Sequence, residues 1–308
     1  MSEGQAAWPA LPAAEWEDTR DTLHLWTQIV GKVRLALEAW VNHSWQVPLY
    51  VNARGLTTSL MPHGGRGVEM QFDFLRHVLE IRTTDGVERL VALEPRTVAD
   101  FYVETMARLG EVGVTVEILP RPVEIPVAVP FAEDKTHASY DAGYAHRFWL
   151  SLVQSQRVLT EFRSRFVGKV SPVHFFWGGF DLAVTRFSGR DAPRHPGGVP
   201  HCADWVMEDA YSQEVSSCGF WPGAGAEGAF YAYAYPEPGG FRDWPVAPAD
   251  AAYDPDLGEF LLPYEVVRTA GDPDATLLSF LQATYEAAAE PGRWDRGRLE
   301  RPLPMTGT

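Results

Sequence analysis

A proline-rich segment near the middle of the chain divides it into two parts of similar length. Its four prolines stand at positions 120, 122, 126 and 130. Proline fixes φ and lacks an amide hydrogen, so such a run disfavours a helix or a central strand and favours an extended connector. We therefore predict an N-terminal half (1–118), a connector (119–135), a C-terminal half (136–292) and a tail (293–308).

Each half begins with helical periodicity and continues with strand patterns. Apolar residues recur at helical spacing over 19–40 and again over 141–166, and alternation such as Val68, Met70 and Phe72 predicts strands. Further strands are expected at 45–53, 56–61, 66–74, 78–83, 88–93, 114–119, 172–177, 181–187, 213–220 and 229–235, and further helices at 97–110 and 272–289. Irregular structure is expected at 190–204, at 236–258 and in a frayed end beyond 292.

The shared order of elements predicts an α+β fold of two related helix–antiparallel sheet–helix halves that form one compact unit. A W-x3-V-x3-R pattern occurs on the first helix of each half, at Trp26, Val30 and Arg34 and at Trp149, Val153 and Arg157. Three matched positions also arise by chance, so duplication and coincidence both stay open. Two such halves commonly pack with a cleft between them.

The charge balance restricts the partners of the protein. Acidic residues outnumber basic residues by 41 to 26, which gives a formal net charge of −15 and argues against nucleic acid and anionic membranes as partners. Apolar runs are too short for a membrane helix, and the N-terminus lacks the positive region of a signal peptide. The two cysteines, Cys202 and Cys218, cannot form a disulfide framework. These features predict a soluble cytoplasmic protein.

The predicted first helix carries an unusual polar row. His24, Gln28 and Lys32 follow one another at four-residue spacing and therefore share one face. Lys32 is one of only three lysines in the chain, with Lys135 and Lys169. One interpretation is a row that faces a ligand, and the other is a solvated helix face that happens to contain a histidine.

The segment 171–187 reads as a very apolar pair of strands that contains three polar residues. His174, Asp181 and Arg186 all need partners if they are buried. One interpretation is a structural network between Asp181 and Arg186. The other is a site in which Arg186 holds a ligand carboxylate and His174 moves a proton.

Motifs of common cofactor and metal sites are missing from the sequence. The tetrapeptide VGKV occurs at 30–33 and 167–170, but valine follows the lysine where a phosphate-binding loop needs Ser or Thr. The histidines and cysteines show no metal-ligand spacing, and no G-x-S-x-G elbow is present. Cys218 is expected to be an inert buried thiol. We therefore predict no cofactor and no metal, with a site assembled from distant residues such as His43, His174 and Glu214 left open.

Four segments stand out together: TLHLWTQIVGKVRL (22–35), VPLYV (47–51), SPVHFFWGGFDLAVTRFSGR (171–190) and GFWPG (219–223). With them the chain resembles an uncharacterised bacterial domain-of-unknown-function family over about residues 8–300. The resemblance implies one family-wide unit without a fused extra domain, and it implies no activity, cofactor or partner. The family tends to have Y-S-H-E where this chain has Tyr211-Ser212-Gln213-Glu214, which puts a metal or acid–base role for position 213 in doubt.

These observations favour a small-molecule site in a cleft lined by the two first helices and the strands of 171–187. The candidate catalytic residues are His24 and His174. The candidate ligand-binding residues are Gln28, Lys32, Arg186, Trp26 and Trp177. Lysine and arginine suit a small anionic ligand, and tryptophans supply apolar walls. The site serves either an enzyme or a binding protein under this hypothesis, and the alternative is a non-catalytic interaction or scaffold protein.

Overall fold

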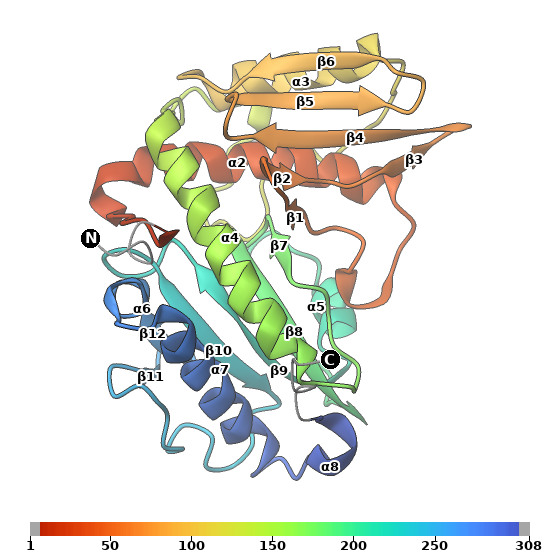
Figure 1. The fold of residues 1–308 in the computed structure, drawn as a ribbon. Coiled ribbons are helices and arrows are strands. Elements are labelled where there is room, and N and C mark those ends of the chain that lie inside the picture. Colours follow the sequence, from red (N-terminus) through yellow and green to blue (C-terminus); the bar gives the residue numbers. More distant parts are fainter. Residues whose placement is uncertain (1–6, 302–308) are drawn as a thin grey trace, which may run out of the picture.

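The computed structural model describes residues 7–301, which form an α+β fold with two similar halves (Figure 1). The first half comprises α2 (Ala13–Leu37), the short helix η1 (Asn42–Ser44), β1 (Tyr50–Val51), β2 (Gly55–Thr57), β3 (Met61–His63), β4 (Arg66–Asp73), β5 (Val78–Thr83), β6 (Glu88–Ala92) and α3 (Val98–Glu111). The second half comprises α4 (Ala142–Ser164), β7 (His174–Phe176), β8 (Asp181–Asp191), α5 (Asp204–Ala210), β9 (Gln213–Trp221), β10 (Ala229–Tyr235), β11 (Ala252–Asp254), β12 (Glu259–Pro263), α6 (Tyr264–Thr269), α7 (Pro273–Ala289) and α8 (Arg296–Leu299). The connector between them contains the short helix η2 (Phe131–Glu133).

Each half is built around a six-stranded antiparallel sheet in which strands close in sequence pair with each other. The first sheet has the order β1-β2-β4-β5-β6, with β3 paired to β4, and the second has the order β11-β12-β10-β9-β8-β7. Helix α3 contacts β6 of the first sheet, and α7 contacts β9 and β10 of the second, whereas α4 contacts β8 and β9 of the second sheet and β1 of the first. Trp26 of α2 stacks on Phe101 of α3 with ring centroids 4.5 Å apart, and Phe101 stacks in turn on Phe72 of β4. On the second sheet α4 and α7 cover one face (Figure 1).

The two sheets meet at a short antiparallel contact between β1 and β7. The amide of Leu49 donates to the carbonyl of Phe175 at 2.9 Å, and the amide of Phe175 donates to the carbonyl of Leu49 at 2.8 Å. These residues are the central positions of the segments 47–51 and 173–177, which occupy the same place in the order of the two halves. Segments at similar places in the order of the two halves therefore pair with each other.

Local sequence explains several element boundaries. Asp272 caps α7 by accepting from the amide of Ala275 at 3.0 Å, and Pro273 stands at the first helical position, where its missing amide hydrogen costs little. Gly86 turns the chain between β5 and β6 with a φ of 87°, which only glycine adopts without strain. The strands at 78–83 and 229–235 have the predicted limits.

Three predictions about elements are wrong, and some elements of the structure were not predicted. Segment 114–119 is extended but forms no strand, because its apolar residues pack on the core while no neighbouring strand pairs with its backbone. The irregular segment 236–258 contains β11, and the two elements that follow it, β12 and α6, were not predicted. Helix α5 follows the loop of 190–204 and was also missed. The chain beyond 292 is not frayed as far as 301, because α8 forms there and the amide of Val167 donates to the carbonyl of Leu299 at 2.7 Å.

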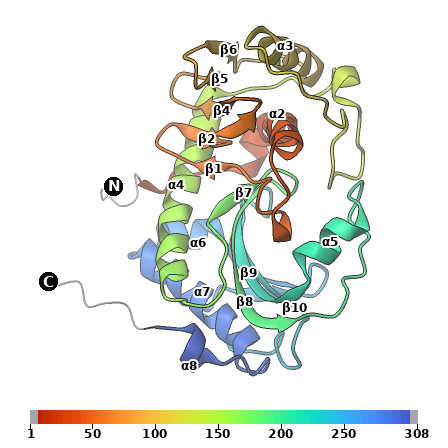
Figure 2. The same ribbon diagram turned by 90° about the vertical axis from the view of Figure 1, so that its right-hand side faces the viewer.

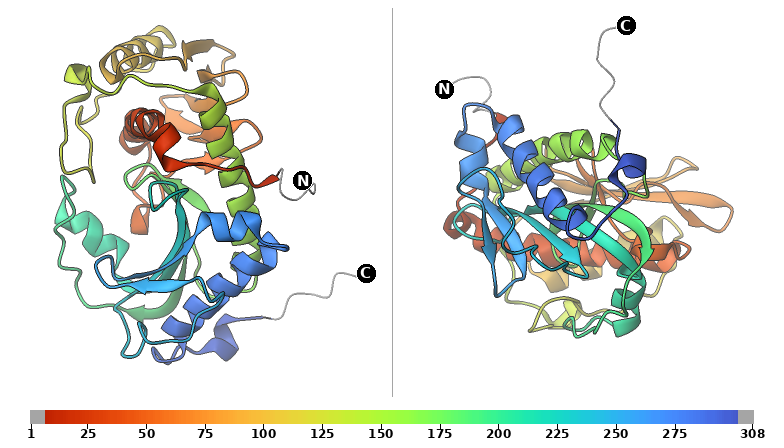
Figure 3. Two further views of the ribbon diagram at one scale, coloured as in Figure 1. Left: turned by 90° about the vertical axis from the view of Figure 1, so that its left-hand side faces the viewer. Right: turned by 90° about the horizontal axis from the view of Figure 1, so that it is seen from below.

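The segment 119–135 contains only the short helix η2 and returns along α2 on the side away from the first sheet (Figure 3). The side chain of Gln28 fixes it there, because its amide group donates to the carbonyl of Val123 and accepts from the amide of Val123, both at 2.9 Å. This pair of hydrogen bonds places the residues after Val123 beside the second sheet. Among residues 7–301, no helix combines the length and the apolar character needed to cross a membrane.

Candidate functional site

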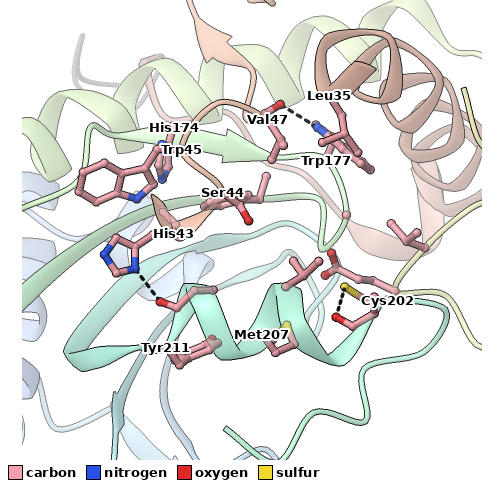
Figure 4. A pocket seen from close by; sticks show the side chains of 18 of the residues that line it. Leu35, His43, Ser44, Trp45, Val47, His174, Trp177, Cys202, Met207 and Tyr211 are labelled. Carbon is pink, nitrogen blue, oxygen red and sulfur yellow. Dashed lines mark hydrogen bonds between the residues drawn. The ribbon is translucent and has the colours of Figure 1, made fainter. Parts of the chain in front are cut away.

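A cavity of about 600 Å³ lies on the face of the second sheet that α4 and α7 leave free. Strands β7 to β10 curve around it, and α5 faces them from the other side (Figure 2). The last turns of α2, η1 and the connector complete its walls, so both halves of the molecule contribute residues (Figure 4). The predicted cleft between the halves is therefore present, except that α4 does not line it.

Aromatic side chains dominate the walls of the cavity. They include Trp40, Trp45, Phe176, Trp177, Phe187 and Trp205. Trp40 and Trp205 are 45% and 55% exposed, and their rings meet with centroids 4.9 Å apart. Trp177 lies deeper, where its indole nitrogen donates to the carbonyl of Val47 at 2.8 Å. Its indole also lies flat against Gly31, because a Cβ on that glycine would collide with the ring. The cavity thus offers a rigid apolar surface of the kind that binds small molecules.

Lys32 projects from α2 into this apolar surface. Its side chain is only 4% exposed, and its ammonium group has no hydrogen bond or ion pair within the part of the chain that the structure describes. The nearest aromatic contact is the ring of Trp177, 5.7 Å from Nζ to the centroid. Loss of hydration lowers the pKa of Lys32 to about 8, although the nearby Cys202 and Glu124 oppose the shift. Lys32 thus places a positive charge without a hydrogen-bond partner against a mainly apolar wall.

Two carboxyl groups lie around the bend of Gly178 and Gly179, opposite α2. A Cβ on Gly178 would collide with the carboxylate of Glu124. A Cβ on Gly179 would lie 2.8 Å from Oδ1 of Asp181 and 3.7 Å from Oε2 of Glu124, so both acids reach within 4 Å of one point. The hydroxyl of Tyr231 donates to Asp181. The two carboxyl groups can approach the backbone of the bend this closely only because both residues of the bend are glycines.

The surroundings of both acids favour their neutral forms. Burial, reinforced by the charge of Asp181, raises the pKa of Glu124 to about 7, and the charge of Lys32 opposes this. Glu124 is nevertheless open to the cavity, so water still hydrates it in part. Burial also raises the pKa of Asp181 to about 6, against the hydrogen bond from Tyr231. Protons can therefore enter and leave this pair of acids near neutral pH.

His174 lines the cavity beside Phe176, as the sequence hypothesis required for a catalytic histidine. It is 1% exposed, and neither ring nitrogen has a hydrogen-bond partner within residues 7–301. Burial, assisted by the positive charges of Arg34 and Arg163, lowers the pKa of His174 to about 3. The imidazole is therefore neutral at pH 7, and its ring forms part of the cavity wall while both nitrogens are buried behind it.

His24 and Gln28 do not line the cavity but hold its walls in place. Nε2 of His24 lies 2.8 Å from the carbonyl of Gly178, and burial lowers the pKa of His24 to about 4. The imidazole is neutral at pH 7, so its N–H donates to that carbonyl and fixes the glycine bend. Gln28 fixes the residue before Glu124 in the same way. The predicted polar row thus positions the acids, and only its last member, Lys32, reaches the cavity.

Arg186 points away from the cavity, and Trp26 lies in the core of the first half. Successive residues of β8 face opposite sides of the sheet, so Arg186 lies on the helix-covered face while Asp181 faces the cavity. The guanidinium carbon of Arg186 is 3.5 Å from the ring centroid of Phe162 and 4.4 Å from that of Tyr285. Both interpretations of Arg186 are therefore corrected, because it neither pairs with Asp181 nor reaches a ligand in this cavity.

Neither Glu124 nor Tyr231 is recognisable as a site residue from the sequence. Glu124 belongs to the connector, whose prolines indicate only a spacer. The feature that marks Glu124 as a site residue is its backbone conformation, which has a φ of 60°. Three other residues that line the cavity also have positive φ values: His43, Ser44 and His201. Non-glycine residues held in this region carry strain and cluster at functional sites. The sequence does not reveal such backbone angles.

Other candidate centres are occupied by structural contacts. Nζ of Lys169 lies 2.5 Å from Nε2 of His43 and donates to Oε1 of Gln213 at 3.0 Å. Burial raises the pKa of the Cys218 thiol to about 12, which favours the inert thiol. Within residues 7–301, no three His, Cys, Asp or Glu side chains are arranged to hold a metal ion.

Comparisons with curated proteins and with solved structures find no similar protein. A comparison with protein families does find a match, and it extends over residues 8–301. It covers both halves, the connector and every residue of the cavity. The chain belongs to DUF5996, a family of unknown function.

Proposed function

We propose that the cavity binds a small molecule with an apolar body and an anionic group, and that Lys32 contacts the anionic group. The observation that carries this proposal is Lys32, which is 4% exposed and whose ammonium group reaches an aromatic cavity of about 600 Å³ without a hydrogen-bond partner within the described residues. Burying an unpaired charge is costly, and a bound anion would remove that cost. The tryptophans around it would cover the apolar body.

The two acids fit this ligand because they need not be charged. Glu124 and Asp181 have pKa values of about 7 and 6, so an incoming anion can drive both to take up protons. Their hydroxyl groups would then donate to the ligand. A scaffold protein would have no need of a cavity on which polar groups converge, and this favours the binding function over the scaffold alternative.

A thermal-shift screen with small carboxylates and organic phosphates tests the proposal. A ligand present at a hundredfold excess over its Kd stabilises the folded protein by about 2.7 kcal/mol, which is measurable as a rise in Tm. We expect such a rise in the wild type and in Lys135→Met, where an exposed lysine is replaced. Lys32→Met keeps the stem packed on Trp177 but removes the charge, and it should lose most of the rise. Equal shifts in all three proteins, or none in any, would contradict the proposal.

We further propose that the protein is cytoplasmic and bacterial and that neither nucleic acid nor membrane is its partner. The net charge of −15 and the free thiols of Cys202 and Cys218 support this. Fractionation of the source cells tests the location directly. Recovery of the protein with membranes or nucleic acid would contradict the proposal.

We also propose that the two halves arose by internal duplication. The support is the antiparallel pairing of Leu49 with Phe175, which are corresponding positions of the two halves, and the similar strand order on either side. An experimental structure tests this by superposition of the halves, with Trp26 expected over Trp149. If the strands of the two halves do not superpose in the same order, the similarity is a coincidence and the proposed duplication is wrong.

A further inference from the structure

We propose that Lys32 binds carbonyl compounds covalently: its amine forms an imine with an aldehyde or ketone in the cavity, and Glu124 transfers the protons. This inference rests on the proposed function, because a small molecule must first occupy the cavity. It extends that function from binding to covalent chemistry.

The placement of Lys32 differs from that of the two other lysines. Its amine faces an aromatic cavity, 5.7 Å from the ring centroid of Trp177, with no hydrogen bond within residues 7–301. Lys169 by contrast contacts His43 and Gln213, and Lys135 is exposed. An amine that is not engaged by a neighbour is free to attack a ligand. Its apolar surroundings also keep water away from a newly formed imine.

The environment of Lys32 increases the fraction of neutral amine. A pKa of about 8 leaves roughly a tenth of the molecules with a neutral Lys32 at pH 7, against well under a thousandth for a lysine at 10.5. Lysines activated in this way by burial in apolar pockets are established nucleophiles towards carbonyl carbons.

Glu124 lines the same cavity as Lys32, and its carboxylate lies against Gly178, the residue after the tryptophan whose ring is nearest to the Lys32 amine. Its charge and that of Lys32 influence each other's pKa, and its own pKa of about 7 supplies both protonation states near neutral pH. The lone pair of Lys32 attacks the carbonyl carbon while the carboxyl group of Glu124 protonates the carbonyl oxygen, and the nitrogen then returns one proton to the carboxylate. This gives a carbinolamine. Glu124 next protonates the hydroxyl group of the carbinolamine. This group leaves as water while the nitrogen lone pair forms the C=N bond.

Reductive trapping at pH 7 with 4-formylbenzoate and cyanoborohydride tests this inference. The probe carries an aromatic body, a carboxylate and an aldehyde, and the hydride converts any imine to a stable secondary amine. Peptide mapping of the wild type should locate the adduct at Lys32, formed at least tenfold faster than at Lys135. Lys32→Arg keeps the charge but cannot form the adduct, whereas the matched variant Lys135→Arg should be labelled at the wild-type rate. Glu124→Gln should slow trapping at least tenfold.

The outcomes separate this inference from the proposed function. Equal labelling of the three lysines in the wild type, or undiminished labelling of Lys32→Arg, would overturn the inference. The wild-type map decides even if a variant fails to fold. The analogue 4-hydroxymethylbenzoate has no carbonyl group and reports binding alone. If this analogue raises Tm but no adduct forms at Lys32, the binding function stands and the covalent step falls. If neither occurs, both fall.

Discussion

Gly31 determines where Lys32 and Trp177 lie relative to each other. A side chain on Gly31 would collide with the indole of Trp177, which contacts α2 at that position. The indole in turn forms the apolar surface next to the ammonium group of Lys32. The cavity therefore depends on a residue that has no side chain of its own.

Gly31→Ala should destabilise the protein by about 1–3 kcal/mol, because the new methyl group overpacks a buried contact. It should also change the fluorescence of the displaced indole and weaken ligand binding. Gly110→Ala in α3 is the matched control, since a Cβ there meets no atom within 4 Å and alanine favours a helix. Urea unfolding of both variants measures the difference, and equal stabilities would show that Trp177 moves freely.

The raised pKa values of Glu124 and Asp181 make anion binding depend on pH. Both acids are neutral below about pH 6 and gain negative charge as the pH rises through 6 and 7, while Lys32 loses its positive charge around pH 8. The negative charges on the two acids repel a bound anion, and the loss of charge on Lys32 removes the partner of the anion. We expect the Kd of the fluorescent anion 8-anilinonaphthalene-1-sulfonate (ANS), whose sulfonate stays charged, to rise several-fold from pH 5.5 to 8. Glu124→Gln should flatten this profile, and a Kd that falls with pH would contradict the assignment.

Helix α5 forms the least firmly held wall of the cavity. None of its residues is buried, and it is held to η1 by the amide of His43, which donates to Asp209 at 2.8 Å. Trp205 on α5 also meets Trp40 across the mouth, with ring centroids 4.9 Å apart. Elements with few buried contacts open at low cost in free energy. Ligands are therefore expected to enter past α5.

Trp205→Ala should speed the release of bound ANS several-fold and change the free energy of unfolding by less than about 1 kcal/mol. The reason is that Trp205 is 55% exposed and closes the mouth without anchoring the fold. Stopped-flow displacement of ANS measures the release rate. Leu257→Ala removes an equally exposed apolar side chain far from the cavity wall and should leave the rate unchanged. An unchanged rate in Trp205→Ala would mean that ligands enter elsewhere.

Elements with strong periodicity were predictable from the sequence, whereas elements that depend on distant partners were not. The long helices and strands such as 78–83 carry their own pattern. Segment 114–119 has the same apolar alternation as a strand, yet no neighbour completes it. Lys32 was found because lysine is rare in this chain and lies on a predicted helix. Glu124 was not, because its position depends on the hydrogen bonds of Gln28 to Val123, the residue before it, which is 95 residues from Gln28 in sequence.

At the scale of the whole molecule, the cavity exists because the two halves meet. The second sheet supplies its floor, α2 and η1 of the first half supply Lys32 and part of the aromatic walls, and the connector supplies Glu124. The sheets themselves are joined at Leu49 and Phe175. The site is thus a property of the complete fold, and the halves taken separately lack it.

The most direct test of the account is whether blocking the cavity abolishes binding. Ala36 is exposed on the last turn of α2 and lines the cavity, so Ala36→Trp fills the mouth with little strain on the core. Ala39→Trp adds the same side chain at an exposed position outside the cavity. An ANS titration at pH 7 should give one saturable site in the wild type and in Ala39→Trp, and a Kd at least tenfold higher in Ala36→Trp. The same Kd in all three proteins, or no saturable site in the wild type, would contradict the claim that this cavity binds small molecules.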